Sequence, residues 1–94
     1  MEIAKRIWNG ARAKEILDNE VFQSAWDEIT EEITEQWKQS PARDPEGREK
    51  LWTMLKLCEK LRQSFQTKLE TGKLAEMERT RLQKLYDSAK SALL

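Results

Sequence analysis

Hydrophobic residues recur at helical spacing along most of the chain, and residues 40–47 form the one strong interruption. Between residues 21 and 38, five apolar side chains follow one another every three or four positions: Phe22, Trp26, Ile29, Ile33 and Trp37. This spacing places apolar side chains on one face of an α-helix. No stretch alternates apolar and polar residues with the two-residue period of a half-buried strand. The pattern therefore predicts an all-α protein.

A second apolar stripe runs from Pro45 to about Thr71 and comprises Leu51, Met54, Leu55, Cys58, Leu61, Phe65 and Leu69. Thr71 and Gly72 then form a C-cap signal, because glycine takes the left-handed conformation that ends many helices. Beyond them we expect a third helix, with one apolar face made of Leu74, Leu82, Leu85, Tyr86, Ala89 and Leu93.

The interruption between the two stripes predicts a tight turn. Pro41 disfavours helical geometry at Ser40. Asp44 followed by Pro45 is an N-cap with proline at the first helical position, so a new helix is expected to begin there. Because the connection is short, the two helices should lie antiparallel as a hairpin. Arg43, Asp44 and Arg48 are expected to cap these helix ends, with contact to a partner as the alternative.

The first 17 residues predict a helix that is less regular. Gly10 in a helix interior costs about 1 kcal/mol relative to alanine, so bending or fraying is expected here. Asp18 and Asn19 supply an N-cap signal that favours a kink, and whether residues 3–39 form one helix or two stays open. The predicted fold is a single domain over residues 1–94. It is a small bundle built on an antiparallel helical hairpin, with a kinked N-terminal segment and a C-terminal third helix.

Charge is balanced overall but polarised along the chain. There are 17 basic and 17 acidic residues among 94, and residues 1–40 are net negative while residues 41–94 are net positive. Eight acids and no base lie between Lys14 and Lys38, and five of them define an acidic face: Asp27, Glu28, Glu31, Glu32 and Glu35. The face is interpreted as ordinary solvated surface, with two functional alternatives: a docking site for a basic protein, or a surface that imitates the charge of DNA.

Metal, cofactor and catalytic chemistry are not expected. Carboxylate metal sites in helical bundles use Glu-x-x-His pairs that point into the core, and this chain has no histidine. Cys58 falls within an apolar stripe, where a thiol behaves as a small hydrophobe. No glycine-rich phosphate loop is present. The sequence therefore predicts a protein that is not an enzyme and binds no cofactor.

Apolar residues outside the main stripes indicate self-association. Trp52 and Leu57 flank the second stripe and Trp8 lies off the line of the first segment, so we expect these three at an oligomer interface. Four basic residues near the C-terminus, Lys73, Arg79, Arg81 and Lys84, offer an alternative as contacts to nucleic acid phosphates. Acidic residues are interleaved with them, which weakens that alternative.

Targeting signals are not evident. A single cysteine gives no internal disulfide, no apolar run approaches the ~20 residues of a membrane span, and the N-terminus lacks the apolar core of a signal peptide. We expect a protein of the cytoplasm, without membrane contact.

Three segments carry a family resemblance: AKEILDNEVFQ (residues 13–23), SPARDPEGREKLW (40–52) and ETGKLAE (70–76). Together they resemble small uncharacterised helical proteins encoded by tailed bacteriophages and prophages. The resemblance implies a viral protein in the cytoplasm of a bacterial host, and transfers no functional residue. The leading hypothesis is an oligomeric protein–protein interaction protein, a phage morphogenesis or virion-associated accessory. The alternatives are an inhibitor that docks on a host or defence protein through the acidic face, and a non-specific nucleic-acid-binding accessory.

Overall fold

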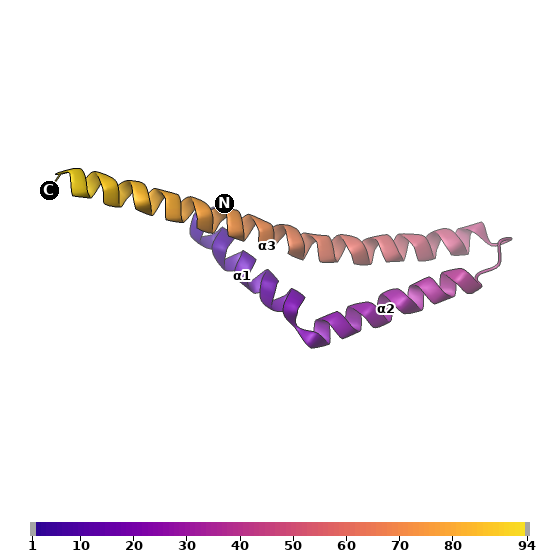
Figure 1. Ribbon diagram of the computed structural model, residues 1–94. Helices are drawn as coiled ribbons and strands as arrows, with labels where there is room; N and C mark the ends of the chain where they lie inside the picture. Colours follow the sequence, from indigo (N-terminus) through magenta and orange to yellow (C-terminus); the bar gives the residue numbers. More distant parts are fainter. Residues whose placement is uncertain (1, 94) are drawn as a thin grey trace.

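The computed structural model describes residues 2–93 and contains three helices within them, α1 (Ile3–Asp18), α2 (Glu20–Gln39) and α3 (Pro45–Leu93). Figure 1 shows α2 alongside the first part of α3, while α1 leads from the far end of α2 back to the middle of α3. The C-terminal part of α3 extends beyond both. No strand occurs among the described residues, so the all-α prediction is confirmed.

Asn19 separates α1 from α2. Its backbone is extended, with φ −70° and ψ 122°, and its side-chain Oδ1 accepts a hydrogen bond from the Phe22 amide at 2.9 Å. The Gln23 amide group reaches back to the Leu17 carbonyl at 2.8 Å and bridges the corner. The predicted N-cap and kink are confirmed, and residues 3–39 form two helices.

Two of the three residues predicted to cap the helix ends at the turn, Asp44 and Arg48, do so. The Asp44 side chain accepts a hydrogen bond from the Gly47 amide at 3.1 Å, which satisfies an N-terminal donor of α3. Arg48 donates to the carbonyl and hydroxyl oxygens of Ser40, both at 2.9 Å, and its guanidinium lies 4.5 Å from the ring centre of Trp37. One arginine thus closes the end of α2 and ties it to α3.

The predicted helix end at Thr71–Gly72 is wrong, and so is the separate third helix. Helix α3 is continuous over 49 residues, and no described glycine has a positive φ. At 1.5 Å per residue it is about 73 Å long, close to the 78 Å length of the whole molecule. Gly72 serves a packing contact rather than a helix end.

That contact joins α1 to α3 through two glycines. A Cβ added to Gly10 would lie 2.7 Å from the Cα of Gly72, and a Cβ added to Gly72 would lie 2.8 Å from the Cα of Gly10. Ala13 and Ala75, three residues further along each helix, are 2% and 0% exposed. Only small residues let two helix backbones approach so closely. The expectation that Gly10 marks a fraying segment is therefore wrong, because it is buried at the tightest helix crossing.

Helix α2 packs on α3 through aromatic side chains. Phe22 and Phe65 meet edge to face, with ring centres 5.8 Å apart at 88°. The indole nitrogen of Trp26 donates to the carbonyl of Cys58 at 3.4 Å, and the guanidinium of Arg62 lies 4.5 Å from the Trp26 ring centre. The predicted antiparallel hairpin is present, since residues later in α2 face residues earlier in α3.

The resulting molecule is long and has a thin core. It measures 78 × 25 × 15 Å, and its radius of gyration of 21.2 Å exceeds the ~12 Å of a compact chain of this length. Its accessible surface is 7638 Å², against about 5,700 Å² for a compact monomer of 11.1 kDa. No large side chain is completely buried among the described residues. A single copy therefore leaves much of its apolar surface in water.

Candidate functional site

A seven-residue repeat of mostly apolar positions runs along α3, and over residues 51–72 the other helices pack on the first of its two sets of positions. Its first set of positions is Leu51, Cys58, Phe65, Gly72, Arg79, Tyr86 and Leu93, and its second is Met54, Leu61, Lys68, Ala75, Leu82 and Ala89. Apolar residues at two such positions of each heptad form the seam of a coiled coil. We call this line of residues the α3 seam. It extends nearly the full length of the helix.

Three segments of the α3 seam differ in what covers them. The first faces α2, because Cys58 and Phe65 contact Trp26 and Phe22. The second faces α1, because Gly72 meets Gly10 and the Arg6 guanidinium lies 3.8 Å from the Glu78 carboxylate. The third begins at residue 79, where α1 has reached its first residues. Both covering helices run antiparallel to α3.

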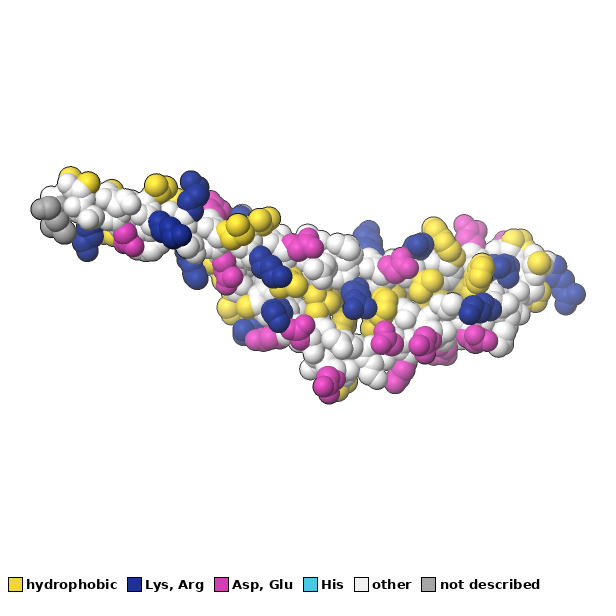
Figure 2. Space-filling view, viewed as in Figure 1, with side chains coloured by type: hydrophobic (Ala, Val, Ile, Leu, Met, Phe, Trp, Pro, Cys, Tyr) yellow, Lys and Arg dark blue, Asp and Glu magenta, His cyan; other side chains and the backbone are white. Residues whose placement is uncertain are grey.

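The third segment is not covered. We call residues 79–93 the C-terminal arm, and every one of them is exposed. Four large apolar side chains of the arm are open to water, with exposed fractions of 45% for Leu82, 56% for Leu85, 63% for Tyr86 and 88% for Leu93. Figure 1 shows the arm as a single helix with no neighbour, and Figure 2 shows apolar side chains along it. A helix of this length without tertiary packing is marginally stable in water.

A second apolar feature lies near the turn. Ile33 and Trp37 of α2 and Leu51, Trp52 and Leu55 of α3 line a cavity of about 220 Å³. Its walls are almost entirely apolar, and Arg48 stacks on Trp37 at its end. Thr34 supplies the one polar side chain among the residues that line this hollow.

The three residues predicted at an oligomer interface do not form one surface. Trp8, Trp52 and Leu57 are all exposed, at 60%, 55% and 61%. Trp8 lies on α1, with Arg12 beside its ring at 5.4 Å. Trp52 and Leu57 are separated by five residues, which at ~100° per residue places them about 140° apart around α3. One flat partner therefore does not cover both.

The predicted acidic face exists as a continuous surface. Asp27, Glu28, Glu31, Glu32 and Glu35 are all exposed on α2, away from α3. Figure 2 shows acidic side chains gathered along this helix. Three of the carboxylates accept hydrogen bonds from neighbours on the same helix, from Ser24 to Glu28, Gln36 to Glu32 and Gln39 to Glu35. Other acids form the ion pairs Arg6–Glu78, Arg12–Glu15, Lys14–Asp18 and Lys56–Glu59.

The four basic residues predicted to contact nucleic acid do not share a face. All four are exposed, and Lys73, Arg81 and Lys84 border one shallow depression together with Glu76 and Met77. Arg79 lies on the α3 seam, on another side of the helix. A phosphate backbone following α3 would meet three of these side chains and an interposed carboxylate. The arrangement favours solvated charge over a nucleic-acid surface.

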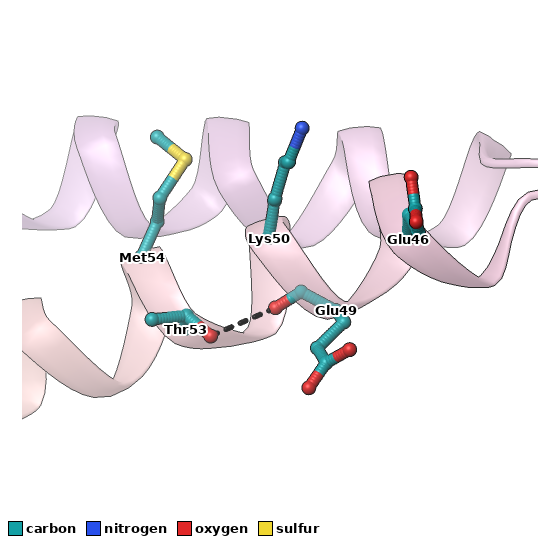
Figure 3. A pocket seen from close by; sticks show the side chains of 5 residues that line it. All are labelled: Glu46, Glu49, Lys50, Thr53 and Met54. Carbon is teal, nitrogen blue, oxygen red and sulfur yellow. Dashed lines mark hydrogen bonds between the residues drawn. The ribbon is translucent and has the colours of Figure 1, made fainter.

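A further depression lies near the start of α3 and is shown in Figure 3. All five of the side chains that line it, Glu46, Glu49, Lys50, Thr53 and Met54, come from the same helix. Thr53 donates its hydroxyl to the Glu49 carbonyl at 2.9 Å, a local bond within the helix. The depression is open surface between side chains and gives no enclosed site.

No group of three or more histidine, cysteine, aspartate or glutamate residues in the part of the chain that the structure describes is placed to hold a metal ion. Within residues 2–93, no helix combines the length and the apolar character that crossing a membrane requires. The best-defined candidate site is therefore the uncovered part of the α3 seam.

The apolar face of residues 82–93 was expected on a separate third helix, because the second helix was expected to end at Gly72. The signal that joins this face to the rest of α3 is the heptad register, which continues from Cys58 through Gly72 to Leu93 with charged residues at only two positions, Lys68 and Arg79. Comparison of the chain with protein-family models, with curated proteins and with solved structures finds no match.

Proposed function

We propose that this chain is a helical protein–protein interaction protein that works as an assembly of several copies. The observation that carries the proposal is the C-terminal arm, whose seam residues Leu82, Tyr86 and Leu93 are exposed, whereas the first set of seam positions is half-buried or buried from Leu51 to Gly72. The chain exposes about 2,000 Å² more surface than a compact monomer of its mass. A standard interface removes about 800 Å² from each partner. The excess is thus large enough to supply at least one such interface.

Sedimentation velocity over a micromolar concentration series tests this proposal. We expect the sedimenting mass to rise with concentration to a multiple of 11.1 kDa. An ideal monomer at every concentration would overturn it.

The resemblance to small helical proteins of tailed phages gives the assembly a biological setting. We propose a morphogenesis or virion-associated accessory, made in the cytoplasm of the bacterial host. Mass spectrometry of purified virions is the test for a virion component. Absence of the chain from virions, together with its presence in the infected cell, would move the proposal to an early protein that acts on the host.

The acidic face supports a second candidate, docking on a basic protein of the phage or the host. Five exposed carboxylates lie on one side of α2, and no base lies between Lys14 and Lys38 to offset their repulsion. Carbodiimide cross-linking in cells joins carboxylates to lysines that touch them. This candidate predicts cross-links from residues 27–35 to lysines of another protein, and it fails if those residues yield none.

A further inference from the structure

We infer that the uncovered seam of the C-terminal arm binds the same arm of a second copy, antiparallel and about a twofold axis. This inference rests on the proposed function and names the contact through which the assembly forms. It follows from the direction of the helices that already cover α3, from the position of α1, and from the residues that the arm presents.

The position of α1 excludes parallel pairing of two α3 helices. Because α3 is a continuous helix, parallel copies would run side by side along the whole seam. Between residues 68 and 78, however, that seam is occupied by α1, whose backbone touches it at Gly72. Antiparallel copies that overlap only through residues 79–93 meet no such obstacle, since their α1 and α2 helices lie at opposite ends of the pair.

The N-terminus of α1 marks where the second arm should end. Helix α1 runs antiparallel to α3 and contacts it at Gly10–Gly72 and Arg6–Glu78. Continued to the start of α1, these contacts place Ile3 close to residue 79. An antiparallel second arm approaches this point with its C-terminal end and continues the line of α1. The negative end of one helix dipole then faces the positive end of another, which is favourable.

One register of the two arms both ends the second arm at the N-terminus of α1 and pairs the heptad positions of the two copies. It places Leu82 opposite Leu93 of the second copy and Tyr86 opposite Ala89 of the second copy. By twofold symmetry each contact occurs twice. The large side chain of Tyr86 faces the small side chain of Ala89, and Leu85 adds apolar area at the edge of the contact.

Charges on the arm are compatible with this register. Arg81, Lys84 and Asp87 lie on the outer side of the helix, away from the seam. Lys90, at the rim, falls beside Gln83 of the second copy and so faces no like charge. Each arm carries four basic residues and one acidic residue, so the remaining repulsion is long-range. Added salt should therefore strengthen the pair slightly by screening it.

Seam and surface variants test the contact. Leu82→Glu removes an apolar side chain from the contact twice per dimer and should weaken the dimer at least about tenfold. The matched control is Lys84→Glu, which introduces the same side chain two residues away on the outer side and should leave the dimer intact. Circular dichroism verifies that each variant remains helical. Equal dimer strength in wild type and Leu82→Glu would overturn the inference.

Spin-label distances test the direction of pairing independently of any destabilising change. The labels are placed at Ser88→Cys or at Lys73→Cys, each in a Cys58→Ala background, so that each protein has one cysteine. In the proposed register the two labels at position 88 are nearly level along the axis, whereas those at position 73 are about 44 Å apart along it. Short distances at both positions would mean parallel pairing and would contradict the inference.

The outcomes separate the inference from the proposed function. A dimer with the expected distances and with sensitivity to Leu82→Glu supports both. A dimer that shows other distances, or one that dissociates as salt is added because the acidic face holds it, overturns the arm-to-arm contact and leaves the proposed function standing. A monomer at all concentrations overturns both.

Discussion

Gly10 and Gly72 meet backbone to backbone where α1 crosses α3, and the two sides of the contact mirror each other. A Cβ on Gly10 would lie 3.0 Å from the carbonyl oxygen of Lys68, and a Cβ on Gly72 would lie 3.0 Å from the carbonyl oxygen of Arg6. Each of these carbonyls belongs to the residue four positions earlier in the facing helix. This geometry suits paired Cα–H···O contacts, which recur where helices approach closely. The crossing fixes α1 across the middle of α3.

Replacing either glycine with alanine should destabilise the protein. Alanine is the better helix former by about 1 kcal/mol, but the new methyl group would lie under 3 Å from backbone that belongs to the other helix. We expect Gly10→Ala and Gly72→Ala each to lower the free energy of unfolding by about 1–3 kcal/mol. Urea denaturation at one fixed protein concentration measures this, because self-association makes stability depend on concentration.

The matched control for this prediction is Ala11→Gly. Ala11 is exposed in the same helix, so this change reports helix propensity without a packing contact. It should cost about 1 kcal/mol. If Gly10→Ala instead made the protein more stable by a similar amount, the close crossing would not exist in solution.

Arg48 should stabilise the turn more than any other charged residue near it. Arg48→Ala removes its hydrogen bonds to Ser40 and its stacking on Trp37, and we expect a loss of about 1–2 kcal/mol. Arg48→Lys keeps the charge but not the planar fork, so it should restore less than half of the loss. Arg43→Ala, in the same turn and exposed, should change stability little. Equal losses from Arg43→Ala and Arg48→Ala in thermal unfolding would contradict the capping role.

Phe22 and Phe65 should be energetically coupled across α2 and α3. A double-mutant cycle with Phe22→Leu and Phe65→Leu measures the edge-to-face pair, for which we expect a coupling of about 0.5–1.5 kcal/mol. The control cycle pairs Phe22→Leu with Leu85→Ala, since Leu85 lies on the C-terminal arm. Those two changes should be additive within about 0.5 kcal/mol. Additivity in the Phe22–Phe65 cycle would show that the rings do not meet in solution.

Reversing charge on the acidic face should stabilise α2. Glu28 and Glu32 are exposed, and each is repelled by a carboxylate three residues later, on Glu31 and Glu35, which the substitutions leave in place. Glu28→Lys with Glu32→Lys should raise the free energy of unfolding by a few tenths of a kcal/mol for each relieved pair, or about 0.5 kcal/mol in total. Glu28→Gln with Glu32→Gln is the neutral control and should give a smaller gain. Self-association should not change, because this face lies off the α3 seam; sedimentation checks that point, and a monomeric double variant would contradict it.

The helices around the turn were predictable from sequence because each is set by local chemistry. Asn19 and Asp44 cap helices by accepting bonds from the amides three positions later, and Pro45 starts a helix through its fixed φ; such signals can be seen in the sequence. Gly72 was not predictable in the same way. A glycine can end a helix by taking a positive φ, or it can lie inside a helix and let another helix approach closely. Which of these Gly72 does depends on Gly10, more than sixty residues earlier in the chain.

The interface prediction for Trp8, Trp52 and Leu57 stays a prediction, because the sequence indicates that they are exposed and not what covers them. Trp8, Trp52 and Leu57 were chosen because they fell outside the stripe of their own helix, which identifies exposure but not a common surface. Whether exposed residues share a face depends on which side each neighbouring helix covers, and α1 and α2 cover different parts of α3. The heptad register from Leu51 to Leu93 was present in the sequence, and reading α3 as one helix is what reveals its uncovered end.

Hydrogen exchange of the C-terminal arm at two protein concentrations tests the central claim most directly. Backbone amides of residues 79–93 have only their own helix to protect them in a single copy, whereas those near Gly10 and Gly72 are protected by the crossing of α1 and α3. Dilution below the association range should make the arm exchange rapidly while the crossing stays protected. Protection of the arm that is strong and unchanged by dilution would contradict the pairing of two arms.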